Sequence, residues 1–268
     1  MRESNKSFVR KEDIVGKIRG QGIKEGDIML VHSSLRSFGY VEGGAETVID
    51  ALLESVGEEG TVIVPTITAK STDSPENPPI FDVNNTPCWT GIIPETFRKR
   101  KEAKRSLHPT HSAAAIGGLR DLIIEGHEFS ESPCDKNSPY YKNAERNGYI
   151  MLIGVDQNSN TSIHSCEEIV GVPYHLQEEF TQVYITGYDG EKILVRNRLH
   201  NWNKPPTDFN KIESLLLEKS IMKIFHIGNS TIRLIKASQM FDMLIDILTK
   251  NPLFLLKNPK EYNHFKRR

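Results

Sequence analysis

A histidine and a carboxylate three residues apart, His164 and Glu167, are the side chains of this sequence best suited to acid–base chemistry. They stand in residues 160–168, which read Asn-Thr-Ser-Ile-His-Ser-Cys-Glu-Glu. If this segment is helical, Thr161, His164 and Glu168 share one face, and Glu167 lies beside the histidine. Histidine titrates near neutral pH, and a carboxylate can orient the ring and stabilise its charged form. The group could therefore take a proton from an attacking nucleophile.

The neighbouring residues predict how this group is held. Residues 149–155 form a short apolar run that is typical of a buried strand, and small polar residues follow it. Asn160 can then cap a helix with its side-chain oxygen. Because open α/β sheets bind ligands at the carboxyl ends of their strands, we expect a site at this edge. An ordinary, partly buried histidine beside a solvated acidic face is the alternative.

A second buried strand is predicted for residues 28–32, and a serine- and glycine-rich loop follows it. A helix begins near Gly44, so the loop combines hydroxyl groups with free amides at a helix N-terminus, which suits phosphate and other oxyanions. A serine-rich turn that merely caps the helix is the alternative. Neither a dinucleotide-binding fingerprint nor a P-loop motif occurs.

Two further histidines, His108 and His111, flank Pro109 in residues 105–112. His108 could simply satisfy a backbone carbonyl in a loop. If His108, His111 and His164 converged with the two glutamates, they could instead hold a metal ion, although the spacing does not match the HExxH pattern.

The remaining pattern predicts an α/β protein with added hairpins. Between the strands, residues 71–87 read as a long surface loop and residues 92–104 as a helix with a basic, solvated face. The other expected elements are helices at 11–21, at 209–220 and after a capping Ser238, a strand at 61–66, a packed element at 113–117, and hairpins at 181–185/192–196 and 222–227/230–235.

The composition limits the classes of function. The 268 residues contain 34 basic and 35 acidic side chains, so the net charge of -1 gives no argument for binding nucleic acid or an anionic membrane. Three cysteines without paired spacing suggest neither a disulfide framework nor a zinc site.

The N-terminus lacks the apolar core of a signal peptide, and no apolar run is as long as a membrane span, so we expect a cytoplasmic protein. Without repeats or a low-complexity linker, residues 1–268 are expected to form a single domain.

Three motifs together resemble one known family. Residues 148–167 read G-Y-I-M-L-I-G-V-x-x-N-S-N-T-S-I-H-S-x-E and look like the central signature of the aminoglycoside 3-N-acetyltransferase family. Residues 31–35, which lead into 43–45, and residues 105–113 agree with it in the family's order. The similarity runs from about residue 10 to residue 250.

The resemblance implies a three-layer α/β/α sandwich with a central mixed sheet, unrelated to the common N-acetyltransferase fold. It also implies that acetyl-coenzyme A lies across the loop that follows the first buried strand, and that the Arg-x-x-His-Pro-x-x-Ser motif lines the acyl-donor channel. The donor-binding residues expected on this basis are Ser33, Ser34, Leu35, Ser37, Gly43, Gly44, Arg105, His108 and Ser112.

The family's histidine base matches His164, and its partner carboxylate matches Glu167. The expected reaction is direct attack of an amine on acetyl-coenzyme A, with Thr161 or a backbone amide stabilising the oxyanion. The acceptor expected from the resemblance is the 3-amino group of an aminoglycoside or a related small amine, and no metal is required.

The expected acceptor-binding residues are Asp156, Asn158 and Glu168. Many family members carry an aspartate where this chain has Asn158, and the nearby Asp156 could substitute for it. A polycationic acceptor would need such acidic groups locally, because the overall charge is nearly balanced.

Two alternatives to the acetyltransferase remain open in the sequence. One is a metal-dependent hydrolase that uses His108, His111 and His164, and the other is a coenzyme A-binding module without catalysis. The sequence also leaves open the true acceptor, the kinetic order and the oligomeric state, with a homodimer as one option.

Overall fold

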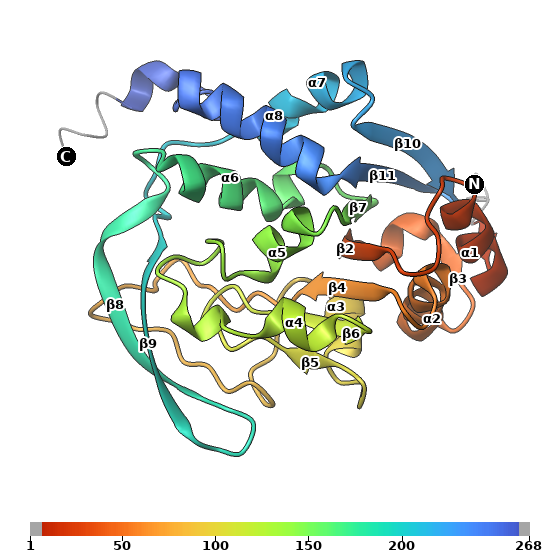
Figure 1. Ribbon diagram of the computed structural model, residues 1–268, viewed down its shortest axis with the longest axis horizontal. Helices are drawn as coiled ribbons and strands as arrows, with labels where there is room; N and C mark the ends of the chain where they lie inside the picture. The colour runs from red at the N-terminus through yellow and green to blue at the C-terminus, as the bar shows by residue number, and fades with distance from the viewer. Residues whose placement is uncertain (1–6, 263–268) are drawn as a thin grey trace, which may run out of the picture.

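The computed structural model describes residues 7–262 and builds them around a seven-stranded sheet in the order β10-β11-β7-β2-β4-β6-β5 (Figure 1). The three middle strands β7, β2 and β4 are parallel, and the strands on both sides of them are antiparallel. The sheet is therefore mixed, as expected. Its strands are β2 (Ile28–Ser33), β4 (Thr61–Pro65), β5 (Lys104–Arg105), β6 (Ala113–Gly117), β7 (Tyr149–Ile153), β10 (Met222–Ile227) and β11 (Ser230–Lys236).

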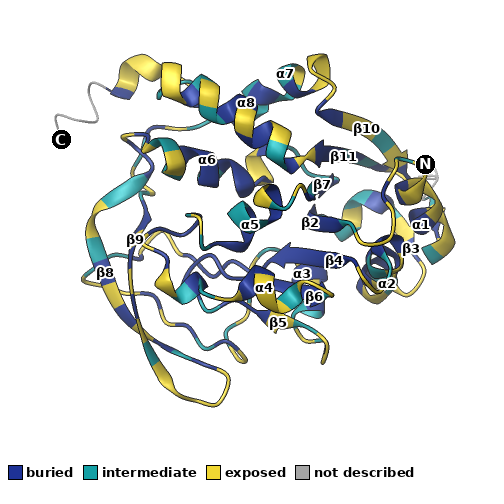
Figure 2. Cartoon of the chain, in the orientation of Figure 1, coloured by how far each residue is buried: buried dark blue, intermediate teal, exposed yellow. Residues whose placement is uncertain are grey.

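Helices cover both faces of this sheet, because successive strand residues point to opposite sides. In β2, Met29 and Val31 pack with the helices of one layer, whereas Ile28 and Leu30 pack with those of the other. Figure 2 shows the buried sheet between helices with exposed outer faces. The predicted three-layer sandwich is confirmed. One layer holds α1 (Lys11–Arg19), α2 (Gly44–Val56) and α3 (Ile92–Phe97), and the other holds α4 (Arg120–Ile124), α5 (Pro139–Glu145), α6 (Ser162–Val170), α7 (Glu213–Glu218) and α8 (Ala237–Lys250).

Both predicted hairpins form. The strands β8 (Leu176–Thr186) and β9 (Lys192–His200) make a separate two-stranded sheet that arches along one side of the molecule (Figure 1). The other hairpin, β10–β11, extends the central sheet through the pairing of β11 with β7. The remaining short elements are β1 (Phe8–Val9), β3 (Tyr40–Val41), η1 (Leu35–Phe38), η2 (His127–Phe129), η3 (Gln157–Ser159), η4 (Phe209–Ile212) and η5 (Pro259–Glu261).

The helix expected at residues 92–104 is shorter than predicted. It ends at Phe97, and Lys104–Arg105 instead form the edge strand β5 against β6. Arg105 is 3% exposed, and its guanidinium donates to the carbonyl oxygen of Thr66 over 2.8 Å. Tertiary hydrogen bonds to the sheet thus override the helical periodicity of the segment.

The basic face expected on that helix is also only partly solvated. Arg98 is paired with Glu95 at 2.6 Å, and its side chain is 5% exposed. Arg100 bonds to Asp50 at 2.6 Å and to Glu46, both on α2. Arg100 therefore ties the segment to the adjacent helix α2, whereas Arg98 is held by a residue of α3 itself.

Two predicted helix caps are wrong. The side-chain nitrogen of Asn160 donates to Gln157 over 3.1 Å, and its oxygen has no hydrogen-bond partner among the described residues. Thr161 occupies the N-cap position of α6. Ser238 lies within α8, whose N-cap is Lys236. Within residues 7–262 we find no helix of the length and apolarity needed to cross a membrane.

Candidate active site

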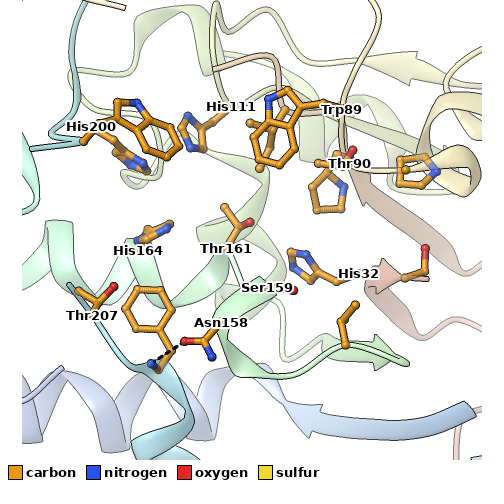
Figure 3. A pocket seen from close by; sticks show the side chains of 18 of the residues that line it. His32, Trp89, Thr90, His111, Asn158, Ser159, Thr161, His164, His200 and Thr207 are labelled. Atoms are coloured by element: carbon orange, nitrogen blue, oxygen red, sulfur yellow. Dashed lines mark hydrogen bonds between the residues drawn. The ribbon is translucent and has the colours of Figure 1, made fainter. Parts of the chain in front are cut away.

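A cavity of about 510 Å³ opens at the carboxyl edge of the central sheet, where β2 and β7 end side by side (Figure 3). His32 and Ser33 reach it from the end of β2, and Thr161 and His164 reach it from the start of α6. The parallel pairing sets Ser33 opposite Ile153, so both strands deliver their following residues to one place. The rest of the lining includes Trp89, Thr90, His111, Asn158, Ser159, His200, Trp202, Lys204, Thr207 and Phe209.

The predicted pair of His164 and Glu167 forms at the wall of this cavity. Nδ1 of His164 lies 2.7 Å from Oε2 of Glu167, and the carboxylate is fully buried. The other carboxylate oxygen accepts a hydrogen bond of 2.9 Å from the hydroxyl group of Tyr174. Since Nδ1–H donates to the carboxylate, the lone pair of Nε2 remains available to accept a proton.

The electrostatics keep this pair in the form that a base needs. Burial lowers the pKa of His164 below its usual value, and Glu167 offsets part of that effect. Burial pushes the pKa of Glu167 upward, but the hydrogen bond and charge of His164 outweigh it, so this pKa lies below the usual value. At neutral pH we therefore expect a neutral imidazole beside a carboxylate.

Behind this pair lie histidines that the sequence analysis did not select. His175 and His200 are buried, and their ring centroids lie 4.6 Å and 4.7 Å from that of His164. They come from the start and the end of the β8–β9 hairpin region, far along the chain from α6. Nothing in their local sequence signals this contact.

Glu168 does not reach the cavity. One of its oxygens accepts from the hydroxyl of Ser132 over 2.6 Å and from the amide of Cys134 over 2.8 Å. The other oxygen lies 3.1 Å from Nε2 of His200. Burial raises the pKa of Glu168 to about 8. Glu168 therefore makes no direct contact with the cavity that would support its predicted role in acceptor binding.

His32 is a second site residue that the sequence analysis missed, although it stands in one of the three family motifs. Its ring is 7% exposed, and Nε2 has no hydrogen-bond partner within the described chain. Burial lowers its pKa to about 3, with a further contribution from His164. The hydroxyl of Ser33 is likewise unpartnered among residues 7–262. Both residues line the cavity, so these unpartnered polar atoms lie close to the space a ligand would take.

The residues expected to bind the donor are only partly brought together. Ser33 lines the cavity, whereas Ser37 lines an adjoining depression that shares Val155 and Ser159 with it. The hydroxyl of Ser37 donates to the carbonyl oxygen of Ser34 over 2.7 Å. The other members of this loop, Leu35, Gly43 and Gly44, lead from the end of β2 into α2.

The side chains of the Arg-x-x-His-Pro-x-x-Ser motif form hydrogen bonds to other groups of the protein. Nε of Arg105 donates to the hydroxyl of Ser112 over 2.9 Å. Nδ1 of His108 accepts from the amide of His111 over 3.0 Å, and Nε2 lies 2.6 Å from Nδ2 of Asn197. The motif thereby positions His111, which does line the cavity. Donor contacts by Arg105, His108 and Ser112 stay a prediction.

The residues expected to bind the acceptor also lie in different places. Asn158 lines the cavity, and its side-chain oxygen accepts from the amide of Phe209 over 3.0 Å (Figure 3). Asp156 accepts from the side chain of Asn210 over 2.9 Å and belongs to the adjoining depression. Among residues 7–262 no acidic residue lines the cavity itself, whereas Lys204 does.

Carboxylates gather instead in a neighbouring depression that meets the cavity at Asn201 and Trp202. A long acceptor could therefore place one amine near His164 and others over these acidic groups. They are Asp73, Glu76, Glu178 and Glu179.

The structure gives no support to the predicted metal trio. Both ring nitrogens of His108 already have partners, and its ring stacks on His127 rather than on His164. His111 contacts His200 at 4.1 Å between ring centroids. The three predicted ligands are therefore separated along a row of packed rings.

The fold and the site define the class of the protein. The family model described as aminoglycoside 3-N-acetyltransferase matches residues 30–249, and the chain belongs to this family. It is therefore an acyltransferase that depends on acetyl-coenzyme A.

The similar proteins agree with this class. The chain is 31% identical to aminoglycoside N(3)-acetyltransferase IV of Salmonella sp over 251 residues, which cover 94% of this chain and 92% of that protein. It is 36% identical over 182 residues to the SPbeta prophage-derived aminoglycoside N(3')-acetyltransferase-like protein YokD of Bacillus subtilis (strain 168), covering 61% of this chain and 66% of that one. A crystal structure of a histidine-to-alanine mutant of the aminoglycoside acetyltransferase AAC(3)-IVa, in complex with a gentamicin, matches with a TM-score of 0.80 and 26% identity, covering 96% of this chain and 95% of that one.

Proposed function

We propose that this protein moves the acetyl group of acetyl-coenzyme A to an amino group of an aminoglycoside, at the 3 position, or of a related small amine. The contact between His164 and Glu167 at the cavity wall carries the proposal. The amine attacks the thioester directly, and His164 takes its proton. We further propose that residues 1–268 form one domain that works in the cytoplasm.

When the amine adds to the thioester carbon, the carbonyl oxygen becomes an oxyanion, which needs hydrogen-bond donors already in place. Thr161 lies at the N-terminus of α6 and lines the same cavity as His164. Its hydroxyl group is the donor that we propose for the oxyanion. His32, with its free Nε2, faces the same space and can supplement this donor.

A panel of amines tests the proposed function, with release of free thiol from acetyl-coenzyme A as the measurement. Thiol release that depends on an aminoglycoside or a small amine supports the proposal. Coenzyme A binding without thiol release for any amine would contradict it and would indicate a non-catalytic binding module.

The donor loop gives a first prediction at Gly44. Its φ of +64° favours glycine, and a Cβ placed there would meet no atom within 4 Å. The side chain would therefore point into open space, where we propose that the donor lies. Replacing Gly44 with Phe should weaken acetyl-coenzyme A binding, measured by calorimetry, much more than replacing it with Ala.

The comparison of the two variants is the control, because both carry the same backbone strain and differ in bulk. Equal donor affinities for Gly44→Ala and Gly44→Phe would remove the loop from the donor site.

The acidic depression gives a second prediction, which concerns salt. If a polycationic acceptor spans Trp202 to reach Glu178 and Glu179, its binding should weaken as salt is raised, because screening reduces attraction between exposed charges. The double variant Glu178→Gln/Glu179→Gln should bind the acceptor more weakly and with less dependence on salt. The KM of the acceptor, measured across a salt series, checks this. An affinity independent of salt in the wild type would point to a neutral acceptor.

A further inference from the structure

The two tryptophans of the sequence, Trp89 and Trp202, both line the cavity that holds His164. They come from different segments, Trp89 from the loop between β4 and α3 and Trp202 from the loop after β9. Trp89 is 59% exposed and Trp202 is 47% exposed. Tryptophan is highly buried on average, because its large ring contributes most when it is removed from water. Two exposed indole rings at one cavity therefore indicate contact with a ligand.

The ring of Trp89 is held in place by the end of β4. Its indole N–H donates to the carbonyl oxygen of Ala69 over 2.9 Å, and its amide donates to that of Ile67 over 3.2 Å. The hydroxyl of the next residue, Thr90, donates to the carbonyl oxygen of Pro65 over 2.6 Å. Figure 3 shows Trp89 and His200 along one side of the cavity. Since the indole has no other polar hydrogen, the ring itself is what the Trp89 side chain can offer a ligand.

Trp202 lies where the cavity meets the acidic depression, because it lines both. Hydrogen bonds of its neighbours hold its turn. The amide of Asn201 donates to the carbonyl oxygen of His175 over 2.7 Å, and the amide of Asn203 donates to the side chain of Asn201 over 3.0 Å. A ligand that extends from the cavity to Glu178 and Glu179 has to pass this indole.

Both rings lack stacking partners in the protein. Among residues 7–262, neither indole stacks on an aromatic ring or lies under a cationic side chain. The half-buried ring of Phe180 differs, because the guanidinium of Arg196 lies 3.8 Å from its centroid. The faces of the two indoles are thus available to a ligand.

The charges around the cavity determine which ligand suits these faces. In the part of the chain that the structure describes, the cavity is lined by Lys204 and by no acidic residue. A cationic acceptor that enters from the acidic depression therefore finds no carboxylate beside it there. The face of an indole attracts a cation, more strongly than those of the other aromatic side chains, and it also packs against the C–H groups of a saturated ring.

We propose that Trp89 and Trp202 form the subsite that binds the rings of the acceptor, an inference that rests on the proposed function and narrows its acceptor to saturated rings that carry ammonium groups. Trp202 binds the part of the acceptor between the acidic depression and the cavity, and Trp89 binds the part inside the cavity. The amine that reacts is then the one that neither an indole nor a carboxylate holds, and it faces His164.

Tryptophan fluorescence tests this subsite without any reaction. Because the sequence contains two tryptophans, Trp89→Phe leaves Trp202 as the single reporter, and Trp202→Phe leaves Trp89. Gentamicin, which is bound in the crystal structure of the similar mutant enzyme, is the probe. Its addition should change the emission of each single-tryptophan protein with saturation, whereas sucrose, an uncharged saccharide, should change neither. Emission that responds to coenzyme A but not to gentamicin would assign the indoles to the donor and overturn the proposal.

Steady-state kinetics measures what the indoles contribute. Trp89→Ala and Trp202→Ala should each raise the KM for gentamicin by about ten-fold, and the Phe variants by less, because phenyl rings attract cations more weakly. The kcat and the KM for acetyl-coenzyme A should change little, because the indoles bind the acceptor equally before and during the reaction. Tyr184→Ala is the matched control, since Tyr184 is 65% exposed on β8 and lies outside the cavity and the acidic depression.

Salt separates the indoles from the carboxylates. The increase in KM caused by Trp202→Ala should persist at high salt, because a contact between touching groups is screened little, whereas the increase caused by Glu178→Gln/Glu179→Gln should shrink. Gentamicin binding to both reporters without thiol release would contradict the proposed function and leave the subsite in place. Acetyl transfer to gentamicin with an unchanged KM in both Ala variants would overturn the subsite and leave the proposed function in place.

Discussion

The His164→Ala protein should bind acetyl-coenzyme A normally but transfer the acetyl group roughly a hundred-fold to ten-thousand-fold more slowly, the usual contribution of a positioned base. The imidazole of His164 lies at the cavity wall and has both an orienting carboxylate and a free ring nitrogen. The loop proposed for the donor lies after β2, so donor binding should survive. Single-turnover transfer with saturating donor and a confirmed acceptor measures the effect.

Glu167→Gln provides the companion variant. It should slow transfer less than His164→Ala, because it misorients the imidazole without removing it. The double variant should be no slower than His164→Ala alone, since the carboxylate acts through the ring. Near-normal transfer by His164→Ala would remove this residue as the base and with it the central part of the proposed function.

The pH dependence of the wild-type rate should distinguish protonation of His164 from protonation of the acceptor amine. A base works when it is unprotonated, so the rate should fall as pH drops through the pKa of His164. Burial lowers that pKa below its usual 6.5, so this fall should lie below pH 6.5. Protonation of the acceptor amine causes a second fall at higher pH. Acceptors with different amine pKa values should shift the second fall and leave the first in place.

The protein should lose stability steeply between pH 7 and pH 5. Burial lowers the pKa of His32 to about 3 and that of His127 to about 4. In the unfolded chain a histidine takes up a proton near pH 6.5, whereas these rings stay neutral in the fold, so stability is lost as pH falls below about 6.5. At pH 5, His32 alone should cost about 2 kcal/mol of the free energy of unfolding. The same sign holds for His108, His111, His175 and His200, whose pKa values burial also lowers well below the usual value.

One buried carboxyl group opposes this trend. The pKa of Glu168, raised to about 8 by burial, adds stability that is fully present below its unfolded value and lost as pH rises through 8. Six histidines outweigh one glutamate, so the net loss on the acid side should remain. Urea unfolding at several pH values measures it, and His127→Asn should reduce the slope with pH by up to one proton. A free energy of unfolding that stays flat between pH 7 and pH 5 would contradict buried neutral histidines.

Local chemistry in the sequence was enough to find the main elements. The strands predicted at residues 28–32 and 149–155 form at Ile28–Ser33 and Tyr149–Ile153, because a short apolar segment is stable only when both faces are buried. The contact of His164 with Glu167 also followed from the sequence, since residues three apart on a helix are neighbours wherever the helix lies. These predictions needed no knowledge of which strands pair.

The tertiary structure decided the rest of the site. His175, His200 and Lys204 reach His164 from the β8–β9 hairpin region and the loop after it, and no local pattern marks contacts across such separations. Residues 98–104, predicted as the end of a helix, are not helical, and the guanidinium of the next residue, Arg105, gains buried partners in the sheet. Helical spacing put Glu168 on the face of His164, but the surroundings turned its carboxyl group inward, where Ser132 and Cys134 satisfy it. Spacing along the chain determines which residues share a face, whereas packing between distant segments determines what that face meets.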